Sequence, residues 1–484
     1  MTDQTSFTLA LLLVAVGLLV AVLASRLSAR LRVATPAVLL IAAAAVANLV
    51  PGWEGLSGAA EERIVSVALV LILFDGGMHI GWRRFRQALG ASTWIAVAGT
   101  LVTAGGIAVV MHWLFGFGWL ESVLLGAALS PTDPAVVFSV FGGREVAGRS
   151  GTILEAESGL NDPVGISLLV ALLAASGSGL DIAVGAAGGF GLQMVIGAAV
   201  GVVGGLALRR VMQRLVLPGE ALHMLLVVAA ALVLYAAGTA AQGSGFLAVF
   251  VAGILVGDVR APFKREVDAF TGGLANLGEI VAFVLLGLTI DAPRIVASGA
   301  LLPGLVLAVL LVLVLRPLLV GAVLLPIALR RGERWFVLLA GLKGAVPILL
   351  GLLVLESGRP GADRLFDVIV VVVLVSVLVQ ASLVPWLADR LRVPMSAAPL
   401  RPYVAGLRFE QEPEEARRLV VEAGSPADGT ALTDLPLSAD GWLSMVRRRG
   451  AIVPLLPGTR LEAGDEVLAF TGDGELARSF RRSG

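Results

Sequence analysis

Long apolar runs alternate with short breaks that carry arginine, glycine or proline along most of the chain. A helix that spans a bilayer needs about 20 mostly apolar residues, and most of the runs approach that length. The pattern therefore predicts an all-α polytopic membrane protein with thirteen spanning helices. They are expected at residues 5–24, 36–50, 63–80, 91–115, 121–140, 150–176, 184–208, 222–238, 245–258, 268–289, 298–322, 334–354 and 365–389.

Basic residues in the breaks predict the side of the membrane on which each loop lies. One alternate set of loops carries nineteen Lys and Arg residues, whereas the other carries only four, Arg63, Arg294, Arg359 and Arg364. Short loops rich in Lys and Arg lie on the cytoplasmic side. We therefore expect a multi-pass protein of the inner or plasma membrane, with the N-terminus outside and the C-terminus in the cytoplasm.

The pattern changes after Arg392. Residues 401–484 are rich in charge, glycine and proline, and turn signals separate short apolar runs such as GAIVPLL and DEVLAF. This predicts a small cytoplasmic α+β domain that follows a membrane domain at residues 1–395. A disordered tail is the alternative, but the β-like runs are too regular for low-complexity sequence.

Composition agrees with a membrane location and excludes several kinds of chemistry. Hydrophobic residues make up 57% of the chain and charged residues 15%, a balance that a water-soluble domain could not carry on its surface. The chain has no cysteine, which excludes disulfides, thiol catalysis and cysteine-ligated metals. The net charge of zero gives no electrostatic reason to expect nucleic acid as a partner, whereas membrane lipid is expected to surround the protein.

Ionisable residues inside the predicted helices are the candidate functional groups. Charge at bilayer depth is costly and persists mainly beside a cavity, a partner or an ion pathway. The candidates are Asp75, Asp133, Glu157, Asp162, Arg316 and Lys343.

Asp133 lies in the segment SPTDP, between Pro131 and Pro134. Two prolines within one turn remove two backbone donors and should break the helix, and broken helices at membrane depth form the substrate sites of many secondary transporters. Thr132 adds a hydroxyl group, so carbonyls, hydroxyl and carboxylate together would suit a monovalent cation. The alternative is a proline kink at which Asp133 caps the second half of the helix.

Four polar residues, Glu157, Ser158, Asn161 and Asp162, belong to the segment ESGLND. Ser158 and Asp162 are i,i+4 neighbours on a helix, a spacing that would aim a hydroxyl and a carboxylate at one point while Glu157 turns to a structural partner. Burial favours the neutral form of a carboxylate, so Asp162 could hold a proton near neutral pH and exchange it for a cation. The alternative is a helix start beside a loop.

Lys343 lies in AGLKGAVPI, where glycines and a proline weaken a second helix midway. An inverted repeat would bring this segment to the first broken one. A buried lysine needs an acidic partner; we expect Glu157, with Arg316 as the rival for that carboxylate. Asp75, in FDGG, is expected either to line the path to Asp162 or to cap a turn at the glycine pair.

Four motifs, FDGG, SPTDPAVV, ESGLNDPVGI and GLKGAVPI, follow one another within residues 5–390. Together they resemble the NhaP-type monovalent cation/proton antiporters, relatives of the animal sodium/proton exchangers. The resemblance implies a thirteen-helix inverted-repeat fold, with a dimerisation part and a core in which two broken helices cross. It also implies a homodimer that exchanges K⁺ or Na⁺ for H⁺, with no cofactor and no enzymatic activity.

The resemblance further implies roles for individual residues. Asp162 would bind the cation and the proton, with Asp133, Thr132 and Ser158 contributing nearby. Asn161 fills a position that is aspartate in electrogenic relatives, which implies a single ionisable group and electroneutral exchange. The residue in GLKGA is usually arginine in the family, and lysine keeps its charge without its bidentate geometry.

The tail resembles the TrkA C-terminal regulatory domain through GSPADGTALTDL, IVPLLPGT and LEAGDEVLAF. This implies a domain that pairs as a dimer and binds a small regulatory ligand, and it favours K⁺ as the exchanged cation. A potassium channel would instead need a filter such as TVGYG, and neither Tyr235 nor Tyr403 lies in such a loop. A membrane-embedded aspartyl enzyme is the other alternative, but the chain lacks a matching GxGD motif.

Overall fold

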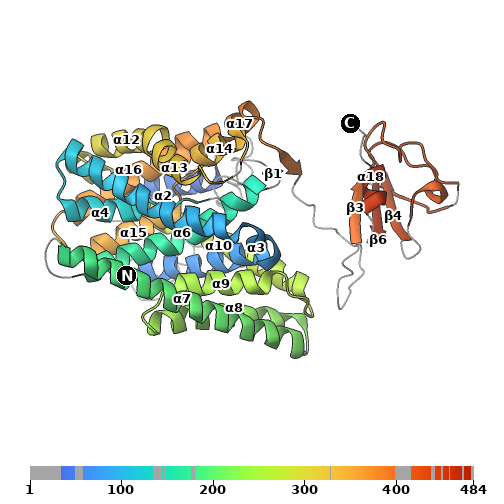
Figure 1. Ribbon diagram of the computed structural model, residues 1–484, viewed down its shortest axis with the longest axis horizontal. Coiled ribbons are helices and arrows are strands. Elements are labelled where there is room, and N and C mark those ends of the chain that lie inside the picture. The colour runs from blue at the N-terminus through green and yellow to red at the C-terminus, as the bar shows by residue number, and fades with distance from the viewer. Residues whose placement is uncertain are drawn as a thin grey trace. The chain divides into compact units, whose positions relative to one another are not determined.

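A computed structural model describes residues 34–49, 58–133, 144–146, 149–175, 180–327, 329–397, 416–437, 442–448, 451–456, 458–470 and 474–480. Contacts divide the chain into two units, Met1–Ala398 and Pro399–Gly484. The first is a bundle of helices and the second contains a four-stranded sheet (Figure 1). The predicted first helix, 5–24, lies outside the described residues.

The helices of the first unit follow the predicted apolar runs. They are α2 (Thr35–Leu49), α3 (Gly58–Phe115), α4 (Trp119–Leu129), α6 (Arg149–Ala174), α7 (Leu180–Arg214), α8 (Glu220–Ala240), α9 (Gly245–Gly257), α10 (Lys264–Leu288), α11 (Ala292–Ala297), α12 (Leu301–Leu310), α13 (Gly321–Val323), α14 (Arg331–Leu339), α15 (Ala345–Glu356), α16 (Ala362–Val375) and α17 (Ala381–Arg390), with π-helical segments η1 (Leu311–Val320) and η2 (Ser376–Gln380). Two short strands, β1 (Arg144–Val146) and β2 (Met395–Ala397), pair in antiparallel fashion. Six helices in the described part of the chain are long and apolar enough to cross a membrane, and four shorter ones are also apolar.

One helix, α3, covers two predicted spans, 63–80 and 91–115. A straight helix of 58 residues would be about 87 Å long, far more than the roughly 30 Å of bilayer hydrocarbon. Gly81 interrupts it with a φ of 65°, which glycine adopts readily. The Asp258 carboxylate, just after α9, lies against Gly81 and accepts a hydrogen bond of 2.6 Å from the Arg83 N–H. The two predicted spans are therefore two helices that meet at a kink at Gly81, and the loop expected between them is helical from residue 82 onward.

Glycines bring α3 and α9 into close contact. A Cβ atom on Gly253 would lie 2.4 Å from the carbonyl oxygen of Phe74, and one on Gly257 would lie 2.3 Å from that of Met78. Small residues allow such close approach of helix backbones in membranes. The half of α3 before Gly81 is thus packed against α9 along its backbone.

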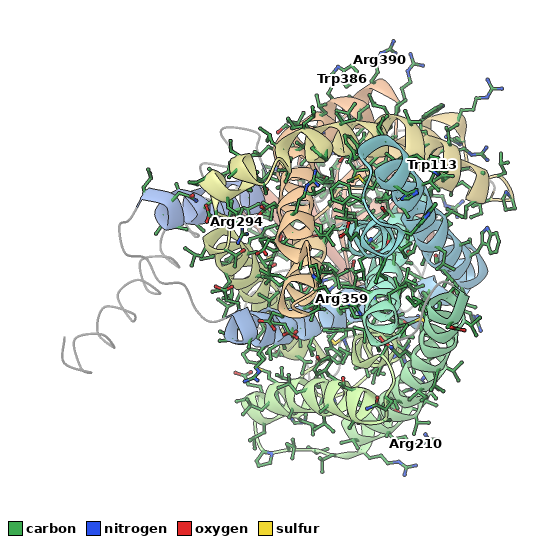
Figure 2. The ribbon with its side chains drawn as sticks, turned by 90° about the vertical axis from the view of Figure 1, so that its left-hand side faces the viewer. Trp113, Arg210, Arg294, Arg359, Trp386 and Arg390 are labelled. Atoms are coloured by element: carbon green, nitrogen blue, oxygen red, sulfur yellow. The ribbon has the colours of Figure 1, made fainter. Side chains whose placement is uncertain are left out.

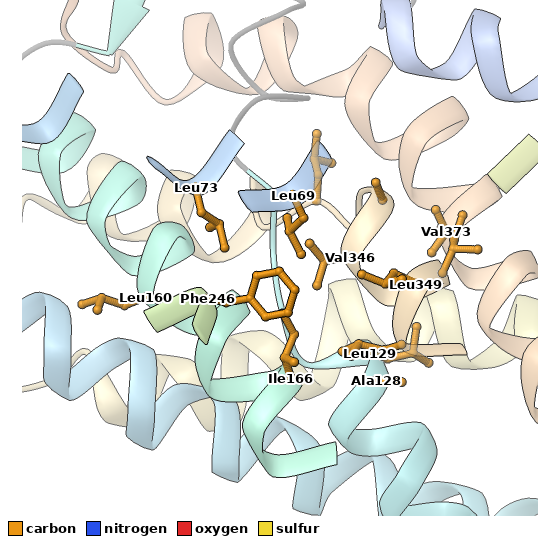
Figure 3. Packing of buried hydrophobic residues seen from close by; sticks show 14 of the residues in the cluster. Leu69, Leu73, Ala128, Leu129, Leu160, Ile166, Phe246, Val346, Leu349 and Val373 are labelled. Atoms are coloured by element: carbon orange, nitrogen blue, oxygen red, sulfur yellow. The ribbon is translucent and has the colours of Figure 1, made fainter. Parts of the chain in front are cut away.

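The interior of the bundle is filled with apolar side chains, and large apolar side chains also cover its surface. Figure 3 shows part of the interior cluster, in which Leu69 of α3 lies close to Val346 and Leu349 of α15. On the outside, Trp113 and Trp386 project away from the bundle (Figure 2), with 76% and 61% of their surface exposed. Exposed tryptophan at helix ends suits anchoring at a membrane interface.

The second unit has an α+β fold. Its strands β3 (Ala416–Val420), β4 (Trp442–Arg448), β5 (Ala451–Val453) and β6 (Glu466–Phe470) form an antiparallel sheet in the order β3-β6-β4-β5, accompanied by the 3-10 turn η3 (Leu432–Asp434) and the helix α18 (Gly474–Ser479). Val446, Val467, Leu476 and Phe480 are buried in a core that belongs to this unit alone. An ordered core of this kind does not fit the alternative of a disordered tail for the described residues.

Candidate functional site

Helix α4, the first of the two helices that were expected to break, ends just before the segment Ser130–Asp133. Helix α4 ends at Leu129, and the residues up to Asp133 are not helical. Pro131 is buried against α6, where a Cβ atom on Gly165 would lie 2.4 Å from the proline ring. Pro134 lies outside the described residues. The helix therefore ends at Pro131, as the prolines predict, and a second half-helix after Asp133 remains a prediction.

The second interruption lies between α14 and α15, at residues 340–344. The two non-helical segments meet, because the Asp133 N–H donates a hydrogen bond of 2.8 Å to the Leu342 carbonyl oxygen. The Asp133 side chain lies directly against Gly344, where an added Cβ atom would come within 1.9 Å of Oδ2. Two segments far apart in the sequence therefore form one polar centre inside the bundle.

Lys343 binds backbone carbonyls, and among the described residues it forms no ion pair with a carboxylate. The Lys343 Nζ donates to the carbonyl oxygens of Ser130 and Pro131 at 3.0 and 2.9 Å. The backbone N–H of Lys343 donates to Ser376 Oγ at 2.8 Å. These carbonyls follow the C-terminal end of α4, where helix carbonyls lack intrahelical partners and carry partial negative charge. The expected pairing of Lys343 with Glu157 is therefore wrong.

Arg316 is the partner of Glu157. Its Nη2 lies 3.0 Å from Glu157 Oε1, and its Nε donates to the Leu338 carbonyl at 2.9 Å. Both side chains are buried. The flat guanidinium reaches the carboxylate of α6 and the last carbonyls of α14 together, which the single ammonium group of a lysine cannot do.

Thr132 is held by two residues of α6. Asn161 Nδ2 donates to Thr132 Oγ1 at 2.7 Å, and the Thr132 N–H donates to Asn161 Oδ1 at 3.3 Å. Ser158 Oγ donates to the Thr132 carbonyl oxygen. The Ser158 hydroxyl is thus directed at the Thr132 carbonyl oxygen. That it converges with the Asp162 carboxylate remains a prediction. Ser158, Asn161 and Asp162 all lie well inside α6, which rules out a helix start beside a loop.

Asp162 is buried, with 7% of its surface exposed. Within the described residues its Oδ1 atom has no hydrogen-bond partner. Asp133 and Lys343 are the charged groups that act on it. The next residue, Pro163, has no N–H to donate to the carbonyl four residues before it, so α6 lacks one backbone hydrogen bond here.

Asp75 lies within α3, and its Oδ2 is 3.2 Å from Nδ1 of His79 one turn later. The glycine pair after Asp75 is helical, so the prediction that Asp75 caps a turn at these glycines is wrong. That Asp75 lines a path to Asp162 remains a prediction.

The sequence analysis did not single out Glu279 or Asp367, two acidic residues within apolar helices. Glu279 of α10 lies near enough to Asp133 for their charges to interact. Asp367 of α16 is fully buried and accepts hydrogen bonds from Arg294 at 3.1 Å and Ser298 at 2.8 Å. Both residues are acidic and lie inside apolar runs, which is the pattern that marks a candidate functional group. Only acidic residues within recognisable motifs were taken as candidates.

The geometry defines a class of protein. The non-helical segments after α4 and between α14 and α15 meet inside an apolar bundle, and carboxylates, a hydroxyl group and backbone carbonyls lie around the point where they meet. Non-helical backbone at membrane depth in this form is characteristic of secondary transporters of small ions.

The transmembrane sodium/hydrogen exchanger family matches residues 11–390. The chain belongs to this family. It is therefore a multi-pass membrane transporter, which excludes the membrane-embedded enzyme considered above.

Curated relatives match over most of the chain. It is 36% identical to the K(+)/H(+) antiporter NhaP of Alkalimonas amylolytica over 406 residues, which is 81% of this chain and 69% of that protein. It is 32% identical to the K(+)/H(+) antiporter NhaP2 of Shewanella sp. (strain MR-4) over 477 residues, 96% of this chain and 81% of that protein.

A solved structure shares the fold. The sodium proton antiporter MjNhaP1 from Methanocaldococcus jannaschii at pH 8 superposes with a TM-score of 0.66 and 20% identity, covering 78% of this chain and 99% of that one. The largely helical architecture is thus that of the NhaP antiporters, as the motifs indicated.

Proposed function

We propose that this chain is a secondary active antiporter that exchanges K⁺ or Na⁺ for H⁺ by alternating access, with cation and proton competing for Asp162. The observation that carries the proposal is the state of that carboxylate, which is buried with one oxygen unpartnered within the described residues. Arg316 is engaged with Glu157, so it does not neutralise Asp162. The carboxylate remains available to a transported ion.

Formal charges at the centre favour electroneutral exchange. Asp133 and Asp162 together carry two negative charges when ionised, and Lys343 carries one positive charge. One proton or one monovalent cation therefore balances the centre, and an unbalanced buried charge is costly. Asn161, which binds Thr132, adds no charge to this balance.

The cation would be held by oxygen atoms. Asp162 and Asp133 supply carboxylates and Thr132 supplies its hydroxyl oxygen, while Ser158 and Asn161 keep Thr132 in place. Oxygen ligands of this kind suit a hard monovalent cation. Ion exchange driven by a gradient involves no redox or group-transfer step, so no cofactor is required.

K⁺ is the proposed physiological cation. The relatives that are 36% and 32% identical are both named K(+)/H(+) antiporters, whereas the structural neighbour named a sodium proton antiporter is only 20% identical. Exchange measured with K⁺ and Na⁺ at matched concentrations would show which cation has the lower KM.

The architecture proposed for the whole protein follows the family resemblance. We place the N-terminus outside and the C-terminus in the cytoplasm, with thirteen spanning helices in two inverted repeats within residues 1–395, and we propose a homodimer. Residues 401–484 would form a TrkA-C-like domain that binds a small regulatory ligand. Truncation after Pro394 is expected to retain exchange and to change its pH or ligand dependence; loss of membrane insertion would contradict this division.

The central test uses purified protein in liposomes with an imposed K⁺ or Na⁺ gradient. Proton movement is followed with a pH-sensitive dye and net current with a potential-sensitive dye. Wild type should move protons without net current, and Asp162→Asn should abolish exchange while remaining folded. Asp181→Asn, at the exposed start of α7, is the matched control and should exchange normally. Exchange by Asp162→Asn would refute the assignment, and a large single-channel current would indicate a channel.

A further inference from the structure

Two polar side chains, Ser376 and Gln380, lie inside the apolar helix that runs from α16 through η2 to α17. They are buried, with 3% and 7% of their surfaces exposed, and they are the first and last residues of the π-helical segment η2. A buried hydroxyl or amide group is costly unless it is hydrogen-bonded. Segments of π-helix are rare and frequently occur at functional sites, so the partners of these two side chains need to be explained.

Both side chains bind the backbone at the break between α14 and α15. Gln380 Nε2 donates to the Leu339 carbonyl oxygen at 2.8 Å and to the Gly341 carbonyl oxygen at 3.4 Å. Ser376 Oγ accepts a hydrogen bond of 2.8 Å from the Lys343 N–H and donates to Gln380 Oε1 at 2.9 Å. The hydroxyl and the amide therefore form one network that holds the end of α14 and two residues of the break.

The network fixes the direction of each of its hydrogen bonds. The Lys343 N–H can only donate, so the Ser376 hydroxyl accepts it and directs its own proton to Gln380 Oε1. Gln380 Nε2 then faces two carbonyl oxygens, which have no other group of this side chain to accept from. The last carbonyls of a helix lack intrahelical partners, and Gln380 supplies one for the end of α14. The pair thus matches this non-helical backbone and no regular helix.

A second π-helical segment holds the same stretch of backbone. Arg316 of η1 donates to the Leu338 carbonyl oxygen at 2.9 Å. Its guanidinium group also lies against Gly341, where an added Cβ atom would be 2.1 Å from Cζ. Side chains from η1 and η2 therefore fix the backbone between Leu338 and Lys343 together.

The position of Asp133 depends on this backbone, because both neighbours of Lys343 contact it. The Leu342 carbonyl oxygen accepts a hydrogen bond of 2.8 Å from the Asp133 N–H, and Gly344 lies against the Asp133 carboxylate. Ser376 holds the N–H of Lys343 between them. A shift of the break would therefore displace the carboxylate of Asp133.

We propose that Ser376 and Gln380 are positioning residues that set the cation selectivity of the site, by holding the break so that the Asp133 carboxylate keeps its place beside Asp162. Neither side chain needs to touch the cation. Selectivity among monovalent cations depends on the size of the site and on the number and field strength of the oxygen atoms around the ion, and both change when a carboxylate moves. The inference rests on the proposed antiport and adds specificity-determining residues to it.

The test is the KM for Li⁺, Na⁺, K⁺ and Rb⁺ in exchange for H⁺, measured with purified protein in liposomes and expressed relative to the KM for K⁺. Ser376→Ala and Gln380→Met each remove a partner of the break. Each should raise the KM for K⁺ about tenfold, the equivalent of about 1.4 kcal/mol, and change the KM ratios between cations. A loss of stability alone would lower the amount of active protein and the maximal rate for every cation alike, and would leave these ratios unchanged.

The matched control is Ser382→Ala, two residues after Gln380. It removes a hydroxyl that donates to the Leu378 carbonyl oxygen of the same helix at 2.7 Å, and it should keep the wild-type ratios. An equal change of the ratios in Ser382→Ala would overturn the inference, because the effect would then not depend on the break.

Wild-type KM ratios in Ser376→Ala or in Gln380→Met would also overturn the inference and leave the proposed antiport intact, since exchange would continue with unchanged selectivity. If one of the two variants does not accumulate as folded protein, the other decides by the same criterion. Failure of the antiport itself would instead be seen as wild-type liposomes that do not exchange.

Discussion

The guanidinium group of Arg316 lies 3.0 Å from the carboxylate of Glu157, and only 4% and 5% of these side chains are exposed. The pair joins η1 to α6, and the hydrogen bond from Arg316 to the Leu338 carbonyl adds the end of α14. Three elements around the polar centre are thus held by one ion pair, separate from the carboxylate proposed to exchange ions.

Removing one member of this pair should destabilise the protein strongly. Glu157→Gln and Arg316→Met are each expected to cost about 3–5 kcal/mol, because each leaves a buried charge without its partner. The double variant Glu157→Leu/Arg316→Met should lose less than the sum of the two. Thermal unfolding of each purified variant in detergent ranks these losses of stability.

The control for this comparison is the pair of Lys264 and Asp268 on α10, in which the Asp268 side chain is 38% exposed. Asp268→Asn should change stability by no more than about 1 kcal/mol, as is usual for partly exposed pairs. Losses of equal size in the buried and exposed pairs would contradict the structural role given to Arg316.

Lys343 gives a second prediction. Lys343→Met removes the donor to the Ser130 and Pro131 carbonyls, which should lower thermal stability and reduce exchange, since the break after α4 would lose its fixed positive charge. Lys264→Met removes the only other lysine of the chain and serves as the control. Full exchange by Lys343→Met would show that the carbonyls need no cation.

Local chemistry in the sequence was enough to predict where the helices break. Pro131 and Pro134 remove backbone donors whatever surrounds them, and the glycines near Lys343 weaken a helix in the same way. The partner of Glu157 could not be found by this route. Both buried basic residues were plausible partners, and the choice depends on how η1 packs against α6, which is a property of the tertiary fold.

Two other features, at Gly81 and Glu279, also depend on the tertiary fold and could not be predicted from the sequence. A kink at Gly81 stands where a loop was expected. Asp258, which is distant in the sequence but close in the fold, supports the unusual backbone there. Glu279 was overlooked because it stands alone in an apolar run, and its nearness to Asp133 exists only once α10 packs against α15.

Gly344 gives a third prediction, on the geometry of the cation site. A Cβ atom at this position would lie 1.9 Å from Asp133 Oδ2, so Gly344→Ala must displace the carboxylate. We expect a raised KM for K⁺ and slower exchange. Gly273→Ala in α10, where an added Cβ atom meets nothing within 4 Å, is the control and should keep normal kinetics. Normal kinetics in Gly344→Ala would place Asp133 outside the cation site.

Asp465 gives the last prediction, which concerns the second unit. It accepts hydrogen bonds of 2.8 Å from Arg448 Nε, from Arg448 Nη2 and from the Glu462 N–H. Burial acts to raise the pKa of Asp465, but these hydrogen bonds and the charge of Arg448 outweigh it, so the pKa lies below its usual value.

The folded-state pKa of Asp465 is thus lower than the unfolded one. Its stabilising effect is fully present above the unfolded value of about 3.9 and is lost as the pH falls through the folded value. Urea unfolding of residues 399–484, which have their own core, should show a midpoint that falls as the pH drops below about 4. In Arg448→Met burial is no longer outweighed, so the folded-state pKa of Asp465 should no longer lie below the unfolded one, and the part of the fall that is due to Asp465 should be absent. Arg447→Met removes a neighbouring exposed pair with Glu466 at 3.7 Å and should follow wild type; a wild-type pH profile in Arg448→Met would contradict the role of this contact.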